Sequence, residues 1–227
     1  MFKAQRKINL KWSPNLAYAI GLITADGCLN KDNRHLWFSS KDLEMLQNFK
    51  KSLSLGNKIG KYARGEEKNK RYFYITFGDI FFYKFLEELG LHPAKSKTIK
   101  SVKIPDKFFR DFFRGLFDGD GSFYSYWDTR WPNSFGFKLS VASASLEFIN
   151  WLKDRLTNLY EIKGYIHTGD GVYNLEYVKG DSRKLYEVMY HDANILYLSR
   201  KYTKITTALR QDDQVGLKFL QKQRKPE

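Results

Sequence analysis

The sequence predicts an α+β fold in which one unit of helices and strands occurs twice. Two related stretches, 19–27 and 113–121, are both apolar, rich in small residues and closed by Asp-Gly, which predicts helices ending at these positions. Each is followed by stretches in which apolar and polar residues alternate, and this period of two is typical of strands with one buried face. Because the same order of elements follows both stretches, we expect a duplicated αββαββα unit with a pseudo-twofold axis. The predicted halves are 1–104 and 105–227.

The two repeated helices are expected to pack side by side. In each, two small residues four positions apart share one helix face, which lets helix backbones approach closely. Parallel packing would bring Asp26 and Asp120 together at the two helix C-termini, where the helix dipoles and mutual repulsion disfavour negative charge. A divalent cation or a shared proton would relieve this repulsion. The predicted interface residues are Gly21 and Ala25 in the first helix and Gly115 and Gly119 in the second.

The remaining elements of the first half can be assigned in chain order. Ser13-Pro14 is a good helix start, with Ser as the N-cap and Pro as the first helical residue. Asp79 is expected to start another helix, and Asp106 to cap the second repeated helix. The predicted elements are a helix ending at Asp26, a hairpin of 28–34 and 35–39, a helix over 40–55, a hairpin of 59–64 and 71–77, and a helix over 80–89.

The second half repeats this order. Leu146-Glu147 matches Leu43-Glu44, and Gly180-Asp181 matches Gly78-Asp79. Lys201 falls opposite Lys97 in this alignment. After Lys204 we expect a closing helix, followed by a basic tail over 222–225 that is solvated.

Composition and charge point to a nucleic-acid partner. Lys and Arg outnumber Asp and Glu by 39 to 25, which gives a net charge of +14. The single cysteine, Cys28, excludes an intramolecular disulfide and a cysteine-based zinc site. No stretch approaches 18 apolar residues, and no apolar signal core follows Met1, so an intracellular protein is expected. A prokaryotic cytoplasm and an organelle both remain open.

The strand alternation separates a buried face from a polar face on each predicted four-stranded sheet. The residues expected to cover the helices are Leu36, Phe38, Phe73, Ile75 and Phe77, and then Phe123, Phe137, Leu139, Val141, Leu175 and Tyr177. The opposite faces and adjoining loops carry long polar and aromatic side chains that suit the DNA major groove and the phosphates. These candidate DNA-binding residues are His35, Trp37, Tyr62, Arg64, Arg71, Tyr72, Tyr74, Ser122, Tyr124, Tyr126, Lys138, Ser140, Lys163, Tyr165, His167, Asn174 and Glu176.

The repeated stretches resemble the signature of the LAGLIDADG homing endonucleases, of the monomeric type that carries two motifs. The small residues, the terminal acid and the final glycine match in both copies; an earlier acid of the motif is present as Asp118 but replaced by Thr24 in the first copy. The resemblance implies two saddle-shaped sheets over a long asymmetric double-stranded DNA site, with metal held by the acids. It also implies cleavage of both strands by a monomer.

The candidate catalytic residues follow from this reading. Asp26 and Asp120 are the predicted metal ligands, joined by the backbone carbonyls of Ala25 and Gly119. Hard oxygen ligands favour Mg²⁺, in two or three ions, with Mn²⁺ or Ca²⁺ able to replace it in binding. The basic residues expected to stabilise developing charge are Lys97 and Lys201, with Lys95, Arg200 and Lys204 as rivals.

Other functions of the same fold stay open at this stage. A non-cleaving DNA-binding regulator would use the same sheets, and an intron RNA-splicing maturase would add intron RNA as a partner. The chain starts with Met1 and ends with Glu227, without the splicing residues of an intein. A free-standing or intron-encoded nuclease is therefore expected rather than one embedded in an intein.

Overall fold

The computed structural model describes residues 8–65, 69, 71–131 and 134–223, with side chains given as far as Leu217. Residues 224 and 225 of the predicted basic tail lie outside the described residues. The boundary between residues 104 and 105 stays a prediction.

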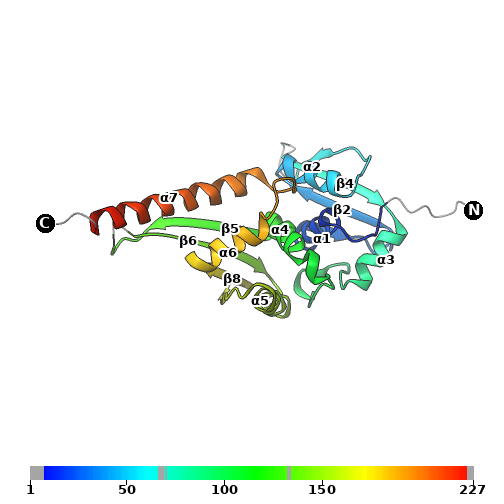
Figure 1. The fold of residues 1–227 in the computed structure, drawn as a ribbon. Helices are drawn as coiled ribbons and strands as arrows, with labels where there is room; N and C mark the ends of the chain where they lie inside the picture. The colour runs from blue at the N-terminus through cyan, green and yellow to red at the C-terminus, as the bar shows by residue number, and fades with distance from the viewer. Residues whose placement is uncertain (1–7, 66–68, 70, 132–133, 224–227) are drawn as a thin grey trace, which may run out of the picture.

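Two repeats with the same order of elements confirm the predicted α+β architecture (Figure 1). The first contains α1 (Pro14–Asp26), β1 (Gly27–Leu29), β2 (His35–Ser40), α2 (Leu43–Ser52), β3 (Gly60–Tyr62), β4 (Tyr72–Gly78) and α3 (Ile80–Glu88). A 3₁₀ turn, η1 (Lys95–Lys97), and a second, η2 (Asp106–Phe108), lead to the other repeat. It contains α4 (Phe109–Asp120), β5 (Gly121–Trp127), β6 (Phe135–Ser143), α5 (Leu146–Tyr160), β7 (Tyr165–Gly169), β8 (Val172–Val178), α6 (Lys179–Met189) and α7 (Ser199–Gln223).

Each repeat forms one four-stranded antiparallel sheet, in the orders β1-β2-β4-β3 and β5-β6-β8-β7. The registers place apolar partners opposite each other, such as Phe38 with Ile75 and Val141 with Leu175. The predicted inner faces are buried, apart from Phe73, which is half-buried. The period-two pattern therefore identified the face of each sheet that packs on the helices.

The helices α1 and α4 lie side by side between the two sheets (Figure 1) and join the repeats. Their backbones touch at the small residues. A Cβ added to Gly21 would lie 2.1 Å from the carbonyl oxygen of Phe112, and one added to Gly115 would lie 2.1 Å from that of Tyr18. A Cβ at Gly119 would lie 2.3 Å from the Cβ of Ala25. At positions 21, 115 and 119 only glycine fits without moving the facing helix.

Helix starts were predicted well where a side chain caps them directly. The hydroxyl of Ser13 accepts a hydrogen bond from the backbone N–H of Leu16, and Asp79 accepts from those of Phe81 and Phe82. The prediction for Asp106 was wrong. Its carboxylate lies 2.6 Å from Nη2 of Arg155, because η2 precedes α4 and places Asp106 beside α5.

The closing helix α7 starts earlier than predicted, at Ser199, and runs alongside β5 and β6 (Figure 1). Its apolar side, with Ile205, Ala208 and Leu209, is buried. Asp212 ties it to α6 through Lys179, at 2.6 Å, and Arg183, at 3.0 Å. The early start has a functional consequence, because Lys201 lies in the first turn of the helix.

A search of the described part of the chain finds no helix with the length and hydropathy needed to cross a membrane.

Substituting Gly115 with Ala should destabilise the protein by about 1–3 kcal/mol, because the added methyl has to push the two helix backbones apart. Gly180 in α6 is the matched control, since a Cβ there meets no atom within 4 Å. Gly180→Ala should be neutral or stabilising by up to about 1 kcal/mol. Urea unfolding of both variants measures the difference, and equal effects would contradict the close packing.

Candidate active site between the repeats

Two carboxylates meet where the paired helices end. Asp26 is the last residue of α1 and Asp120 the last of α4, and each is followed directly by the first strand of its repeat. Both residues are exposed, although protein surrounds enough of each carboxylate to affect its ionisation. Burial raises the pKa of Asp26, and burial together with the charge of Asp26 raises the pKa of Asp120 to about 6.

Two buried lysines lie beside these acids. Nζ of Lys201 donates to the carbonyl oxygens of Phe117, Gly119 and Gly121, at 2.6, 3.2 and 2.6 Å, and so covers the C-terminus of α4. Nζ of Lys95 donates to the carbonyl oxygen of Gly27, at 2.5 Å, at the C-terminus of α1. A cation at a helix C-terminus interacts favourably with the dipole. Burial nevertheless lowers the pKa of both lysines, that of Lys201 to about 8.

The structure corrects the predicted pairing of Lys97 with Lys201. Lys97 is exposed on η1, and it is Lys95 that contacts the residue after the first motif acid. The 3₁₀ turn η1 points its first residue, Lys95, inward and leaves Ser96 and Lys97 exposed. A sequence signal for the right pairing exists: Lys95 and Lys201 each precede a buried isoleucine, Ile99 and Ile205, by four positions.

The rival basic residues lie elsewhere. Arg200 is exposed and pairs with Asp42, and Lys204 is exposed on α7. Of the basic residues considered, Lys201 and Lys95 are therefore the ones that lie near Asp26 and Asp120.

A cleft of about 270 Å³ opens beside Asp120. Lys95, Ser96 and Ser143 contribute polar groups to its wall, and Ala25 and Phe148 contribute apolar ones. The cleft is thus lined by both repeats and gives the carboxylate of Asp120 access from outside.

The outer face of the first sheet is an aromatic cluster. The rings of Trp37 and Tyr74 stack with centroids 4.3 Å apart, and Tyr62 packs edge-on against Trp37 at 5.6 Å. Tyr72 completes the cluster beside Tyr62. Of the other predicted contacts in this half, His35 pairs with Asp32 at 2.6 Å, and Arg64 and Arg71 are exposed next to the strands.

The outer face of the second sheet is more polar, and several of its side chains interact with one another. Nζ of Lys138 lies 2.9 Å from a carboxylate oxygen of Glu176, and Nε2 of His167 lies 3.8 Å from the other oxygen. The hydroxyls of Ser122 and Ser140 are 2.8 Å apart. The other predicted residues are Tyr124, Tyr126 and Tyr165, which are exposed on this face, Asn174, which is half-buried there, and Lys163, which is exposed just before β7.

Comparison with known proteins identifies the family. A family model described as a LAGLIDADG-like domain matches residues 13–90 and again residues 108–189, which together form most of the chain. The chain belongs to this LAGLIDADG family.

Relatives of this LAGLIDADG protein are distant. An uncharacterized protein of Methanocaldococcus jannaschii, MJ0314, is 27% identical over 126 residues, which cover 54% of the chain and 46% of that protein. The chain thus spans about half the length of this curated relative.

Solved structures of similar fold carry both nuclease and other names. The meganuclease I-AabMI bound to uncleaved DNA has a TM-score of 0.61, with 15% identity and coverage of 91% of this chain and 92% of that one. The endonuclease I-DmoI in complex with DNA and Ca has a TM-score of 0.51, with 17% identity over 79% and 91% of the two chains. The N-terminal LAGLIDADG domain of DUF199/WhiA has a TM-score of 0.52, with 20% identity over 83% and 93%. These likenesses show the shared fold.

The earlier acid of the second LAGLIDADG motif has a structural role here. Asp118 is fully buried and accepts hydrogen bonds from the hydroxyl of Tyr18, at 2.7 Å, and from the backbone N–H of Leu198, at 2.9 Å. Thr24 at the equivalent position bonds the carbonyl of Ile20 within its own helix. Asp118 therefore ties α1 and the segment before α7 to α4.

The terminal acids fit a divalent cation. Among the described residues, no donor bonds the carboxylate of Asp26 or Asp120. Burial makes the ionised form of Asp26 less favourable, and burial together with the charge of Asp26 does the same for Asp120. Within the same residues no group of three or more His, Cys, Asp or Glu side chains is placed to hold a metal, so these two carboxylates are the acidic ligands that the site offers. The predicted carbonyl of Gly119 already accepts from Lys201, at 3.2 Å, and keeps one lone pair free.

Substituting Asp120 with Asn should raise the melting temperature at pH 7.5 in the absence of divalent cations. The pKa of Asp120, raised from 3.8 to about 6, means that ionisation is less favourable in the folded than in the unfolded protein. The stability that the protonated form of Asp120 contributes is fully present below about pH 4 and is lost as the pH rises through about 6. The variant should therefore match the wild type at pH 4. Thermal melting at both pH values tests this, and equal differences at pH 4 and 7.5 would contradict it.

Proposed function

We propose that this protein is a divalent-metal-dependent endonuclease that cuts both strands of a long, asymmetric DNA site as a monomer. The observation that carries the proposal is that two exposed carboxylates, those of Asp26 and Asp120, meet at the end of the helix pair with raised pKa values and with a buried lysine beside each. Such a group of poorly balanced charges is typical of a functional site rather than of a stabilising core.

The acids would hold the metal, with Mg²⁺ as the preferred ion because its ligands are hard oxygens. When bound, two or three such ions supply a nucleophilic water and neutralise charge on the attacked phosphate. The I-DmoI structure with DNA and Ca supports divalent metal binding at this fold. Mn²⁺ or Ca²⁺ would replace Mg²⁺ in binding.

Lys95 and Lys201 are proposed to stabilise the negative charge that develops during phosphodiester cleavage. Their ammonium groups are fixed by backbone carbonyls and largely removed from water, so they need little reorganisation as the charge develops. The lysines also hold the helix ends that carry the acids. Each repeat would contain one lysine that stabilises charge and holds a helix end. Two such lysines match the two proposed cuts, one in each DNA strand.

The outer faces of the two sheets would bind DNA. The net charge of +14 favours a polyanion, and the polar and aromatic residues on these faces can reach base edges in the major groove. The relatives I-AabMI and I-WcaI are both described as bound to DNA. The two faces differ in chemistry, aromatic in the first repeat and polar in the second, so an asymmetric target is expected.

A non-cleaving DNA-binding protein is the second candidate. The similarity to the WhiA domain, whose name mentions no nuclease, favours it. It would use the same sheets without chemistry at the acids, so a cleavage assay separates the two functions.

Asp26→Asn and Asp120→Asn should each abolish double-strand cleavage while DNA affinity stays close to that of the wild type. Asn keeps the size of the side chain but removes the charge that holds the cation. The target is first found by cleavage selection from a randomised DNA library with Mg²⁺, and the variants are then compared on supercoiled DNA that contains it. Linear product formed by either variant at the wild-type rate would remove that aspartate from the mechanism.

Lys95→Met should slow cleavage by about 10²–10³-fold, as loss of a charge-stabilising group does in other enzymes. The matched control is Lys97→Met, because Lys97 is exposed on the same turn, and it should cut at close to the wild-type rate. Single-turnover cleavage and DNA affinity are measured for both. A greater loss of rate in the Lys97 variant would restore the pairing expected from the sequence.

A further inference from the structure

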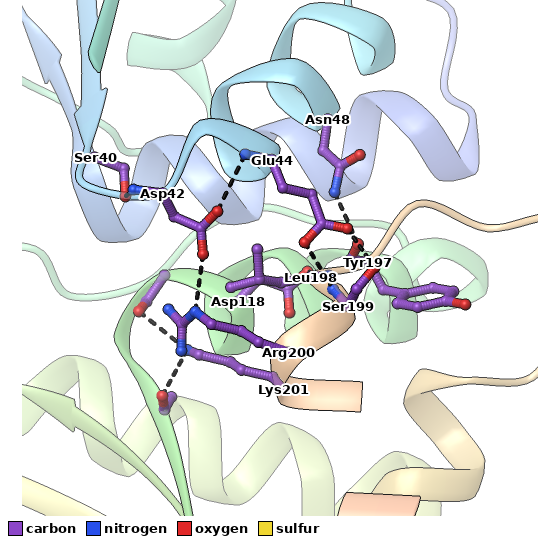
Figure 2. A network of polar contacts seen from close by, with 12 residues as sticks. Ser40, Asp42, Glu44, Asn48, Asp118, Tyr197, Leu198, Ser199, Arg200 and Lys201 are labelled. Carbon is purple, nitrogen blue, oxygen red and sulfur yellow. Dashed lines mark hydrogen bonds and ion pairs between the residues drawn. The ribbon is translucent and has the colours of Figure 1, made fainter. Parts of the chain in front are cut away.

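The segment that carries each active-site lysine is held by a helix of the other repeat. Before Lys201, the backbone N–H of Ser199 donates to Oε2 of Glu44 in α2, at 3.0 Å, and the hydroxyl of Ser199 donates to Oε1 (Figure 2). Arg200 pairs with Asp42, the N-cap of α2, at 2.8 Å. Nearby, the side chain of Asn48 donates to the carbonyl oxygen of Tyr197, at 2.8 Å.

The same arrangement recurs for Lys95 with fewer contacts. The hydroxyl of Ser145, the N-cap of α5, donates to the carbonyl oxygen of Ile99 at 2.5 Å. Glu147, which occupies the position in α5 that Glu44 has in α2, reaches Lys100 at 3.4 Å, and both side chains of this pair are more than 60% exposed. An exposed pair of this kind contributes little.

Glu44 occupies a favourable place for fixing α7. The first N–H groups of a helix have no partner within it, and the positive end of the dipole attracts a carboxylate. Glu44 takes two hydrogen bonds from the first residue of α7, so the carboxylate of one repeat caps a helix of the other. The direction and register of the first turn of α7 thus depend on α2.

The position of Lys201 follows from this turn. Its backbone N–H bonds the carbonyl oxygen of Leu198, and the N–H of Leu198 bonds Asp118 on α4. Ser199 directly follows this anchor, and only Ser199 and Arg200 lie between the anchor and Lys201. A shift at Ser199 would therefore move Nζ of Lys201 away from the three carbonyl oxygens that hold it at the end of α4.

We infer that Glu44 and Asp42 of the first repeat are positioning residues for Lys201 of the second repeat. This inference rests on the proposed nuclease function, because the lysine acts in the cleavage reaction. Lys95 has its own anchor on α5, so weakening the α2 contact affects one lysine and leaves the other in place. The expected consequence is slower cutting of one DNA strand and accumulation of nicked DNA.

The test compares Glu44→Ala with Glu44→Gln and with the control Glu147→Ala. Each strand of a target duplex is end-labelled, and single-turnover rates are measured for both strands. Glu44→Ala should slow one strand by about 10–100-fold, as small displacements of catalytic groups do, with little change in DNA affinity. Glu44→Gln keeps an oxygen that accepts from Ser199 and should restore most of the rate. Glu147→Ala should cut both strands near the wild-type rates, because its pair is exposed.

A second measurement does not require cleavage. Amine-reactive labelling of the free protein, read by mass spectrometry, should show faster modification of Lys201 in Glu44→Ala and unchanged modification of Lys95. If the wild-type protein cuts no DNA in the selection, the proposed function fails and this labelling alone decides whether Glu44 positions Lys201.

Three results would overturn the inference. The first is labelling of Lys201 in Glu44→Ala at the same rate as in the wild-type protein. The second is faster labelling of Lys201 while both strands are still cut at wild-type rates. The third is equal slowing of both strands together with a lower melting temperature, which would assign Glu44 to general stability.

Discussion

The close contact between the backbones of α1 and α4 is the constraint on which the rest of the structure depends. Gly21 rests on the carbonyl of Phe112, and Gly115 on that of Tyr18. At this separation the two helix ends bring Asp26 and Asp120 to one place. Because β1 and β5 start at the next residue in each case, the same contact also sets where both sheets begin.

The negative charges at the ends of α1 and α4 are only partly neutralised by the neighbouring lysines. Two helix C-termini and two carboxylates concentrate negative potential, and Lys95 and Lys201 neutralise the carbonyl oxygens more directly than the acids. Folding alone would be better served by neutral residues at these positions. Carboxylates that face solvent beside a cleft are consistent with the cation binding proposed above.

Much of this fold could be predicted from the sequence, because its signals are local. The repeated motif with Gly21 and Gly115, the strand alternation around Phe38 and the cap at Asp79 each act within a few residues, and the structure has the helix pair, sheets and cap that they indicate. Asp26 and Asp120 could be placed at one end of the helix pair for the same reason. The roles assigned to them stay proposals.

The details that the sequence did not reveal depend on contacts between distant segments. The alignment of the two repeats placed Lys97 opposite Lys201 and overlooked the spacing of Lys95 from Ile99, and the turn of η1 decides which of the two lysines is buried. At the start of α7, the backbone N–H of Ser199 donates to Glu44, which is 155 residues away. Likewise, Lys138 and Glu176 were each expected to contact DNA, and only the pairing of β6 with β8 shows that they neutralise each other in the free protein.

The contact between α2 and α7 also bears on how such duplicated proteins diverge and recombine. The N-cap of α2 is Asp42, while its counterpart on α5 is Ser145, and each has a different partner from the opposite repeat. The two halves are thus no longer interchangeable modules. A hybrid gene that joined the first half of one relative to the second half of another would have to inherit Glu44 and Ser199 as a matched set, even though they lie on opposite sides of the fusion point.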